Sequence, residues 1–282
     1  MGTGLKSRFA QIIYSDCICG RHREFQSLIS YTQEKVFKAY EDLSIARCSN
    51  CYVLKTLAAA NKVQPVKSNT EFYEGNKNIF TDYFTKLVSQ IVKYRKSGKV
   101  LDVGCATGIL LNIFVKQGFT VWGLEPNPAA WKLSRTRFPK RIFQLKLSEF
   151  LKHHRLRFDV IVYNHVLEHV VDVQKEIQNI KKALKPGGML VLGLPNTDNI
   201  IFKIRGKYWE SLLPNQHHWH FSTKYIHSLL RREEFQILET TFNNHLRQDY
   251  PFVKRLYFGI LNTINSIFHT GEAMTILAKK SF

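Results

Sequence analysis

Four of the five cysteines stand in two close pairs near the start of the chain, a spacing that suits metal binding. They are Cys17, Cys19, Cys48 and Cys51. Thiolates placed two or three residues apart can wrap one tetrahedral zinc ion, and Asp16 and His22 flank the tighter first pair as substitute ligands. The pattern predicts a structural zinc site, because four thiolates would leave no open position for catalysis; the alternative is a set of free buried cysteines.

A glycine-rich turn over residues 102–108 (Asp-Val-Gly-Cys-Ala-Thr-Gly) follows an apolar run typical of a buried strand. Gly104 and Gly108 would let a ligand approach the backbone closely, and the N–H groups of such a turn can meet a carboxylate. The next expected strand ends at Glu125, where an acid can accept both hydroxyls of a ribose. The turn alone would also fit tight strand–helix packing, but together with Glu125 it predicts a nucleotide-type ligand.

The turn resembles the Asp-x-Gly-x-Gly-x-Gly motif of class I S-adenosylmethionine-dependent methyltransferases, with Ala106 in place of the middle glycine. The similarity continues through residues 158–169 (Phe-Asp-Val-Ile-Val-Tyr-Asn-His-Val-Leu-Glu-His) and 184–188 (Leu-Lys-Pro-Gly-Gly), and it covers roughly residues 75–282. It implies a Rossmann-like α/β fold with a doubly wound, mostly parallel sheet, and S-adenosylmethionine as the methyl donor. We expect Ala106 to tighten the turn slightly without abolishing binding.

The resemblance also implies which residues hold the donor. They are Asp102, Gly104, Gly108, Glu125, Pro126, Leu147 and Asn164. The two glycines would contact the methionine part, Glu125 the ribose, and Pro126 or Asn127 the adenine. The family often has an acid directly after the third strand, whereas here the first acid is Glu149. The residue that reads the adenine amino group is therefore left open.

Two groups of histidines could remove a proton from an oxygen acceptor. His165 and His169 follow the expected fourth strand, and residues 216–222 (Gln-His-His-Trp-His-Phe-Ser) follow the fifth. Methyl transfer from a sulfonium is an in-line displacement, so the protein mainly aligns the acceptor and, for a hydroxyl, takes up its proton. Histidine titrates near neutral pH and suits that task. We expect His220 to be the base, with His165 as the second candidate; a metal site among residues 217–220 is the less favoured alternative.

Alternating apolar runs and amphipathic segments would position these groups. Strands are expected at 99–103, 119–124, 141–145, 158–163, 189–194 and 273–278, and helices at 80–91, 107–117, 127–137 and 172–184. Such alternation predicts a parallel sheet with helical crossovers. Ser222 should cap a further helix. We divide the chain into a cysteine module (1–60), a linker with a helix (61–98) and a catalytic domain (99–282).

Charge indicates the class of partner. Lys and Arg number 41 against 22 Asp and Glu, which leaves a net charge of +19 and predicts an anionic partner. We expect a small anionic or glycosylated acceptor, such as a nucleotide sugar or a surface-polysaccharide precursor, whose diphosphate Lys203, Arg205 and Lys207 could grip. The alternatives are a phenol of the quinone-pathway type, which the catalytic domain also resembles, and RNA, although no RNA-binding module accompanies the charge.

Residues 251–268 form a strongly apolar helical pattern. We expect the helix to pack on the sheet or on another subunit; peripheral docking on a membrane is the alternative. The chain shows no secretory signal pattern and no apolar run long enough to span a bilayer, so we expect a cytoplasmic enzyme. The oligomeric state is left open.

Overall fold

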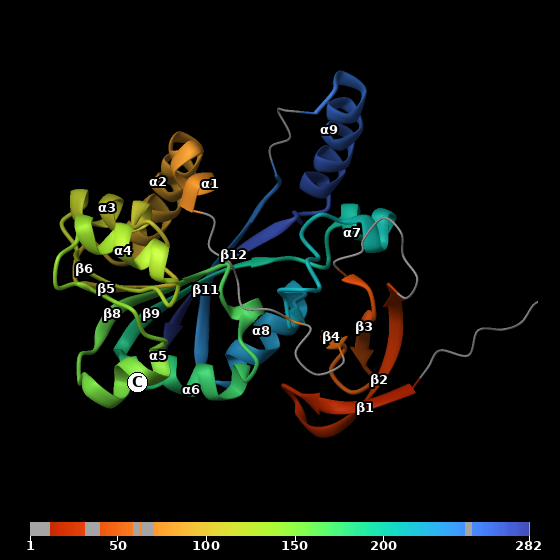
Figure 1. Cartoon of the computed structure of the whole chain (residues 1–282), viewed down its shortest axis with the longest axis horizontal. Helices are drawn as coiled ribbons and strands as arrows, with labels where there is room; N and C mark the ends of the chain where they lie inside the picture. Colours follow the sequence, from red (N-terminus) through yellow and green to blue (C-terminus); the bar gives the residue numbers. More distant parts are fainter. Residues whose placement is uncertain (1–11, 32–39, 59–62, 64–69, 246–249, 282) are drawn as a thin grey trace, which may run out of the picture.

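A computed structural model describes residues 12–31, 40–58, 63, 70–245 and 250–281, and Figure 1 shows how they are arranged. The described residues form two sheets. The larger has seven strands in the order β11-β12-β9-β8-β5-β6-β7, and the smaller has five in the order β1-β2-β3-β4-β10. The larger sheet carries the glycine turn, and the smaller carries the cysteine pairs.

Five strands of the larger sheet run parallel: β5 (Lys99–Val103), β6 (Thr120–Leu124), β7 (Ile142–Phe143), β8 (Phe158–Asn164) and β9 (Leu184–Pro195). β12 (Ala273–Lys280) is antiparallel to β9, and β11 (Phe235–Asn243) is antiparallel to β12. The central strands are nearly continuous Val, Ile and Leu, because helices bury both of their faces. This arrangement confirms the predicted doubly wound, mostly parallel α/β fold. The expected strand at 141–145 is shorter than predicted, and β11 was not predicted.

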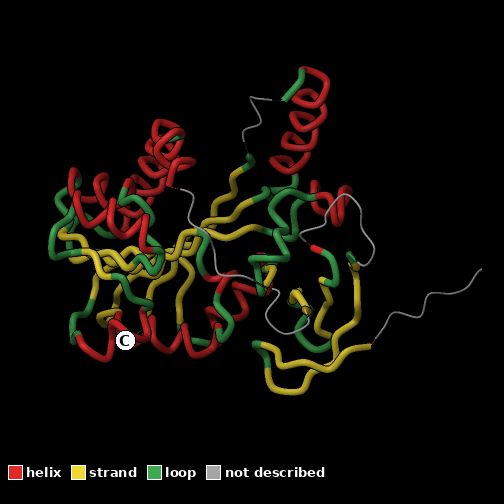
Figure 2. Tube along the Cα trace, in the orientation of Figure 1, coloured by secondary structure: helices red, strands yellow, loops and turns green. Residues whose placement is uncertain are grey.

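Helices cover both faces of this sheet (Figure 2). α1 (Thr70–Gly75), α2 (Lys77–Tyr94), α3 (Ile109–Lys116) and α4 (Pro128–Arg137) lie on one side, and α5 (Leu147–His153), α6 (Val173–Ala183) and α8 (Thr223–Arg232) lie on the other. The two sides bury separate clusters, one around Phe84 and Phe114 and one around Phe150 and Ile177. Ser222 accepts the Tyr225 N–H, as expected of the N-cap of α8. The helices that flank the glycine turn lie where the sequence predicts them.

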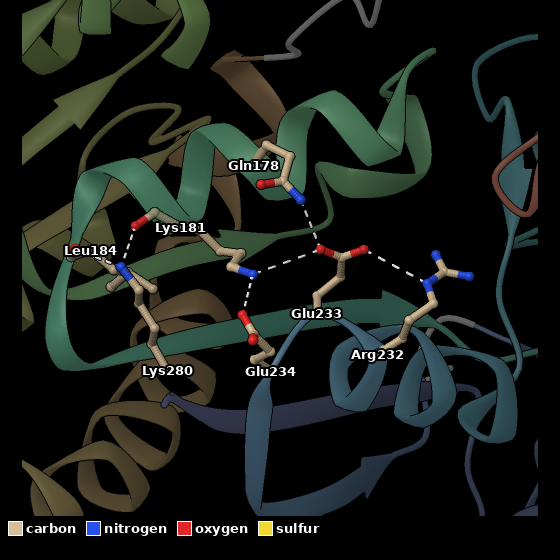
Figure 3. Close-up of polar contacts among 7 residues, drawn as sticks. All are labelled: Gln178, Lys181, Leu184, Arg232, Glu233, Glu234 and Lys280. Carbon is tan, nitrogen blue, oxygen red and sulfur yellow. Dashed lines mark hydrogen bonds and ion pairs between the residues drawn. The ribbon is translucent and has the colours of Figure 1, made fainter. Parts of the chain in front are cut away.

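A polar network at the C-terminal ends of α6 and α8 links these two helices to each other and to β12 (Figure 3). Gln178 donates a 2.8 Å hydrogen bond to Glu233, and Lys181 pairs with Glu234 at 2.9 Å. Lys280 on β12 donates to the Lys181 carbonyl at 2.7 Å. The network holds α8 in place, and the segment that precedes α8 completes the smaller sheet.

The smaller sheet is antiparallel throughout. Its strands are β1 (Ile12–Cys17), β2 (Gly20–Ser30), β3 (Leu43–Cys48), β4 (Leu54–Ala58) and β10 (Trp219–His220). β10 belongs to the part of the chain that follows the large sheet's fifth parallel strand, and Trp219 pairs with Lys55. The division of the chain at residue 60 stays a prediction, but the N-terminal strands share their sheet with residues 219–220.

A third cluster joins the N-terminal strands to α7 (Ile200–Arg205) and α9 (Phe252–Ile267) through Tyr31, Ile201, Trp209 and Phe258. Figure 1 shows α9 standing away from the large sheet, which differs from the expectation that this helix packs on it. Across the described parts of the chain, no helix is both long enough and apolar enough to cross a membrane.

Candidate active site

The glycine turn joins β5 to α3 and adopts a backbone that few side chains tolerate. Gly104 has φ 75°, and a Cβ there would lie 2.6 Å from the Val166 side chain. Gly108 has φ 82°, and Ala106 between them has φ 45°. Ala106 therefore adopts the left-handed conformation that glycine reaches without strain. The alanine leaves this part of the motif in a glycine-type conformation.

Glu125 at the end of β6 is bound to the same turn. Its carboxylate accepts the Ala106 N–H at 2.9 Å and the Asn127 N–H at 2.8 Å. Asp102 is buried at the end of β5, and burial raises the pKa of both acids, with the charge of Glu125 raising that of Asp102 further. The structure thus brings Asp102, the glycines and Glu125 to one edge of the sheet, the carboxyl ends where ligands of such folds bind.

The expected adenine-side residues have mixed surroundings. Pro126 is exposed, and Asn127 caps α4 by accepting two N–H groups. Leu147 is fully buried in the core on the side of the sheet that carries α5 and α6. Glu149 accepts the Lys146 N–H at the start of α5. Because Glu149 caps its own helix, its position gives it a structural role. Adenine contacts of Pro126 and Leu147 stay predictions.

The end of β8 carries His165, which is partly exposed. His165 has φ 54°, and its N–H donates to the Gly193 carbonyl at 2.9 Å. Its Nδ1 lies 3.3 Å from Glu168, whose side chain is 1% exposed against 38% for His165. Next to it, Asn164 accepts a 3.0 Å hydrogen bond from the Tyr83 hydroxyl. A buried carboxylate therefore holds one ring nitrogen of an imidazole that is partly exposed.

Glu168 is surrounded by imidazoles. Burial alone would raise the pKa of Glu168, but the hydrogen bond with His165 and the nearby His165, His169 and His217 lower it to about 2. Burial lowers the pKa of His217 to about 4, so this ring is neutral near pH 7. His169 is anchored by its Nδ1, 3.0 Å from the Gln216 carbonyl oxygen. The acid of this cluster is thus ionised at neutral pH, and a histidine next to it is held neutral.

Glu168, His169 and His217 could also hold a cation, since their ligand atoms lie within 4.8 Å of one another. Among the described residues, the second carboxylate oxygen of Glu168 and Nδ1 of His217 are buried and find no hydrogen-bond partner. A metal site here was disfavoured from sequence because no acid lies beside residues 217–220. The fold supplies that acid from a distant segment.

His220 lies next to this cluster, with its ring centroid 6.0 Å from that of His217. It sits on β10, is 4% exposed, and its Nε2 lies 2.9 Å from the Thr56 hydroxyl of β4. Burial lowers its pKa well below the usual value. These surroundings favour a structural role, in which His220 ties β10 to β4 within the smaller sheet. The role of base stays a prediction for His220, but its ring is not open to an acceptor as that of His165 is.

The two cysteine pairs meet as the spacing predicts. The Cys17 and Cys51 sulfurs are 3.5 Å apart, those of Cys19 and Cys48 are 3.8 Å apart, and all four lie within 4.8 Å. Four sulfurs about 2.3 Å from one zinc ion would be about 3.8 Å apart, whereas a disulfide needs about 2 Å. The donor set therefore fits a tetrahedral ion. Asp16 instead accepts the His22 N–H, so neither is needed as a substitute ligand.

α1 matches no element expected from the sequence. Its Tyr73 is half-buried, and both desolvation and the charges of Glu125, Asp102 and Glu168 raise its pKa, which places it near all three acids. Glu74 forms a two-point ion pair with Arg137, which also donates to the Thr107 carbonyl at 2.6 Å. Tyr73 and Glu74 lie in no recognisable motif, and only the fold brings them to the glycine turn.

The other basic residues singled out from sequence lie on α7 and just after it. Arg205 is engaged with the Tyr208 carbonyl and with Glu210. The Lys207 ammonium lies 5.3 Å from the centre of the Tyr208 ring. Their grip on a diphosphate stays a prediction.

Comparison with known proteins agrees with this geometry. Residues 76–240 match a family model described as "Methyltransferase domain". The ubiquinone biosynthesis O-methyltransferase of Coxiella burnetii (strain RSA 493 / Nine Mile phase I) is 32% identical over 130 residues, 44% of this chain and 56% of that protein. The enzyme of the same name from Histophilus somni (strain 2336) is 36% identical over 107 residues, 35% of this chain and 45% of that protein. The chain thus spans about half the length of these curated relatives.

Solved structures share the fold. A SAM-dependent methyltransferase from Archaeoglobus fulgidus superposes with a TM-score of 0.54 at 18% identity, covering 74% of this chain and 99% of that one. The 1,6-didemethyltoxoflavin-N1-methyltransferase of Burkholderia thailandensis, with substrate and S-adenosylhomocysteine bound, gives 0.52 at 18% identity, covering 85% and 96%. At these identities the likeness concerns the fold alone.

Proposed function

Because this chain belongs to the methyltransferase domain family, we propose that it uses S-adenosylmethionine to methylate a hydroxyl of a small molecule, with His165 as the base. S-adenosylmethionine supplies, when bound, a methyl group already activated on a sulfonium. The chain must then hold the donor, align the acceptor and receive a proton.

The turn and Glu125 are the residues that would hold the donor. A Cβ at Gly104 would meet Val166, so the turn needs its glycine there. Glu125 is fixed by two backbone N–H groups, which leaves lone pairs on its carboxylate oxygens for the hydroxyls of a ribose. Asp102, Gly108, Pro126, Leu147 and Asn164 complete the proposed donor set.

The observation that carries the choice of base is the contact between His165 and Glu168. With the Nδ1 hydrogen directed at the buried carboxylate, Nε2 is left bare to accept a proton from a hydroxyl. The low pKa of Glu168, about 2, keeps it ionised, so its charge stabilises the imidazolium that forms. His165 lies at the carboxyl end of β8, the edge that also carries the glycine turn.

For the acceptor, we propose a phenol of the quinone-precursor type first. The support is that the curated relatives are ubiquinone biosynthesis O-methyltransferases, whose matching part is 30–36% identical to this chain. A nucleotide sugar or surface-polysaccharide precursor is the second candidate, favoured by the net charge of +19. Both are small molecules with a hydroxyl to methylate.

We also propose that Cys17, Cys19, Cys48 and Cys51 hold one structural zinc ion. The sulfur separations support it, and so does the small size of the N-terminal sheet, which has little core of its own. The ion would stabilise the sheet that β10 completes, and it takes no part in the proposed methyl transfer.

The test is turnover with labelled S-adenosylmethionine on a panel of catechols, nucleotide sugars and RNA, with the product identified by mass spectrometry. His165→Ala should lower turnover at least about 100-fold while the donor Kd changes little. His165→Gln serves as a matched variant that keeps a polar side chain but cannot act as a base. Full turnover of both variants, or methyl transfer only to RNA, would overturn the proposal.

A further inference from the structure

α9 has two separate apolar faces; one is buried and the other is exposed. Phe258, Leu261 and Asn265, spaced three and four residues apart, are buried. Phe258 and Leu261 belong to the cluster around Ile201 and Trp209. The Asn265 side chain accepts the Ile200 N–H at 2.9 Å. This inner face is therefore enough to fix the helix to α7.

The other face is a stripe of exposed apolar side chains along the whole helix. Its members are Phe252 (73% exposed), Val253 (77%), Leu256 (57%), Ile260 (55%) and Ile267 (67%). At 100° per residue these five positions fall within an arc of about 100° on the side of the helix away from Phe258 and Leu261. Phe268, directly after the helix, is 71% exposed as well. Single exposed apolar residues are ordinary, but a continuous row of them marks an interaction surface.

We name these five residues (Phe252, Val253, Leu256, Ile260 and Ile267) the α9 stripe. The charge of the residues near it indicates which kind of partner covers it. Residues 251–271 contain Lys254 and Arg255 and no acidic residue, and both side chains are exposed. Lys203 and Lys207, on and after α7, add positive charge, whereas Arg205 is paired with Glu210. A second copy of this chain would carry the same net charge of +19. An anionic surface is the complementary partner.

The shape of the element leads to the same choice. Figure 1 shows α9 projecting from the body of the molecule. A helix with one exposed face of Phe, Leu and Ile, and with its basic residues outside that face, is suited to lie in the plane of a bilayer surface. We propose that α9 docks the protein peripherally on a bilayer containing anionic lipids, with the α9 stripe inserted among the acyl chains and Lys254 and Arg255 at the headgroups.

The experiment is sedimentation of the full chain with vesicles of phosphatidylcholine, with and without phosphatidylglycerol, at low and physiological salt. We expect binding that needs phosphatidylglycerol and weakens with salt. Leu256→Ser together with Ile260→Ser should weaken it at least about tenfold. The matched control is Ile79→Ser on α2, another exposed apolar residue (51%), which should bind as the parent does. Lys254→Ser with Arg255→Ser should lose the dependence on phosphatidylglycerol.

Vesicle binding tests the docking proposal without any measurement of enzyme activity. Protein that stays in the supernatant with anionic vesicles, or a double variant that sediments like the parent, overturns the proposal. Sedimentation velocity without lipid tests whether the protein dimerises through the stripe. A dimer that dissociates in the Leu256→Ser, Ile260→Ser double variant would show that a second copy covers the stripe, and would overturn the proposal. Donor binding in the same preparations tests the proposed catalytic function separately.

Discussion

The Nε2 of His220 lies 2.9 Å from the hydroxyl of Thr56, and both side chains are buried where β10 pairs with β4. The bond joins the strand that follows the second cysteine pair to the segment that follows β9. Thr56 also donates its N–H to the His218 carbonyl, and the His218 N–H donates to the Glu168 carbonyl. The cysteine module is thus connected by backbone hydrogen bonds to the residue that holds His165.

Buried histidines should make stability fall in mild acid. The pKa of His220 is well below its usual value and that of His217 is about 4, so between about pH 6.5 and 4 the unfolded chain binds protons that the folded chain does not. Stability is then complete above pH 6.5 and falls by up to about 1.4 kcal/mol per pH unit for each such group. His220→Gln should have a lower free energy of unfolding at pH 7.5, measured by urea titration. Below pH 6.5 its free energy of unfolding should fall less steeply with pH than that of the parent. An unchanged slope would show that His220 is not held neutral. Loss of turnover in a fully folded His220→Gln would restore it as the base.

Removing one cysteine of the cluster should remove the metal. We expect elemental analysis to find about one zinc ion per chain, and Cys48→Ser to have none and to unfold at a lower temperature, since the ion contributes to the folding of the N-terminal sheet. Cys105→Ala, outside the cluster, is the control and should keep the zinc. A parent protein that is free of metal and equally stable would end the zinc proposal.

Glu125→Ala should weaken binding of S-adenosylmethionine about 10- to 100-fold, the size expected for losing a carboxylate that accepts hydroxyl hydrogen bonds. Isothermal calorimetry measures the effect, and circular dichroism verifies that the domain stays folded. Glu149→Ala is a matched acid-to-alanine control, because Glu149 caps α5. Equal donor affinity in the parent and Glu125→Ala would contradict the assigned pocket.

Two opposite substitutions test the backbone of the turn. Gly104→Ala puts a Cβ 2.6 Å from Val166 at φ 75°, so it should cost at least about 1–2 kcal/mol of stability and reduce donor affinity. Ala106→Gly relieves a left-handed alanine at φ 45° but makes the unfolded chain more flexible, so its stability should change by less than about 1 kcal/mol. Donor affinity of Ala106→Gly should not fall. Similar losses in both variants would mean that the turn responds to any change of volume and not to backbone conformation.

The ion pair between Glu74 and Arg137 should matter for the donor although neither residue lies in a motif. Arg137→Ala frees α1 from the turn and should raise the donor Kd severalfold, and Glu74→Ala should do the same. Arg135→Ala on the same helix is the control, because Arg135 stacks on Trp131 instead. If calorimetry gives the same donor Kd for all three variants, α1 does not act on the turn.

Local residue patterns are sufficient to predict the elements that form from neighbouring segments. Apolar runs of strand length, the glycines at 104 and 108 and the acid at 125 follow one another within a few dozen residues. The strand–turn–helix unit they specify forms from neighbouring segments. The parallel sheet and the glycine turn could therefore be predicted. The meeting of the cysteine pairs was predictable for a similar reason, because thiolate spacing is itself the signal for a metal site.

Contacts between segments far apart in the sequence arise from the fold. Glu168 contacts His165 locally, three residues away, but it meets His217 because the segment before β10 packs against the end of β8. The pairing of β10 with β4 buries His220, which the sequence favoured as the base. Tyr73 and Glu74 reach the turn through a six-residue helix without a motif. The two faces of α9 look alike in composition, and packing against α7 selects which one is buried. Contacts of this kind depend on how the chain closes in space, which short-range residue patterns do not encode.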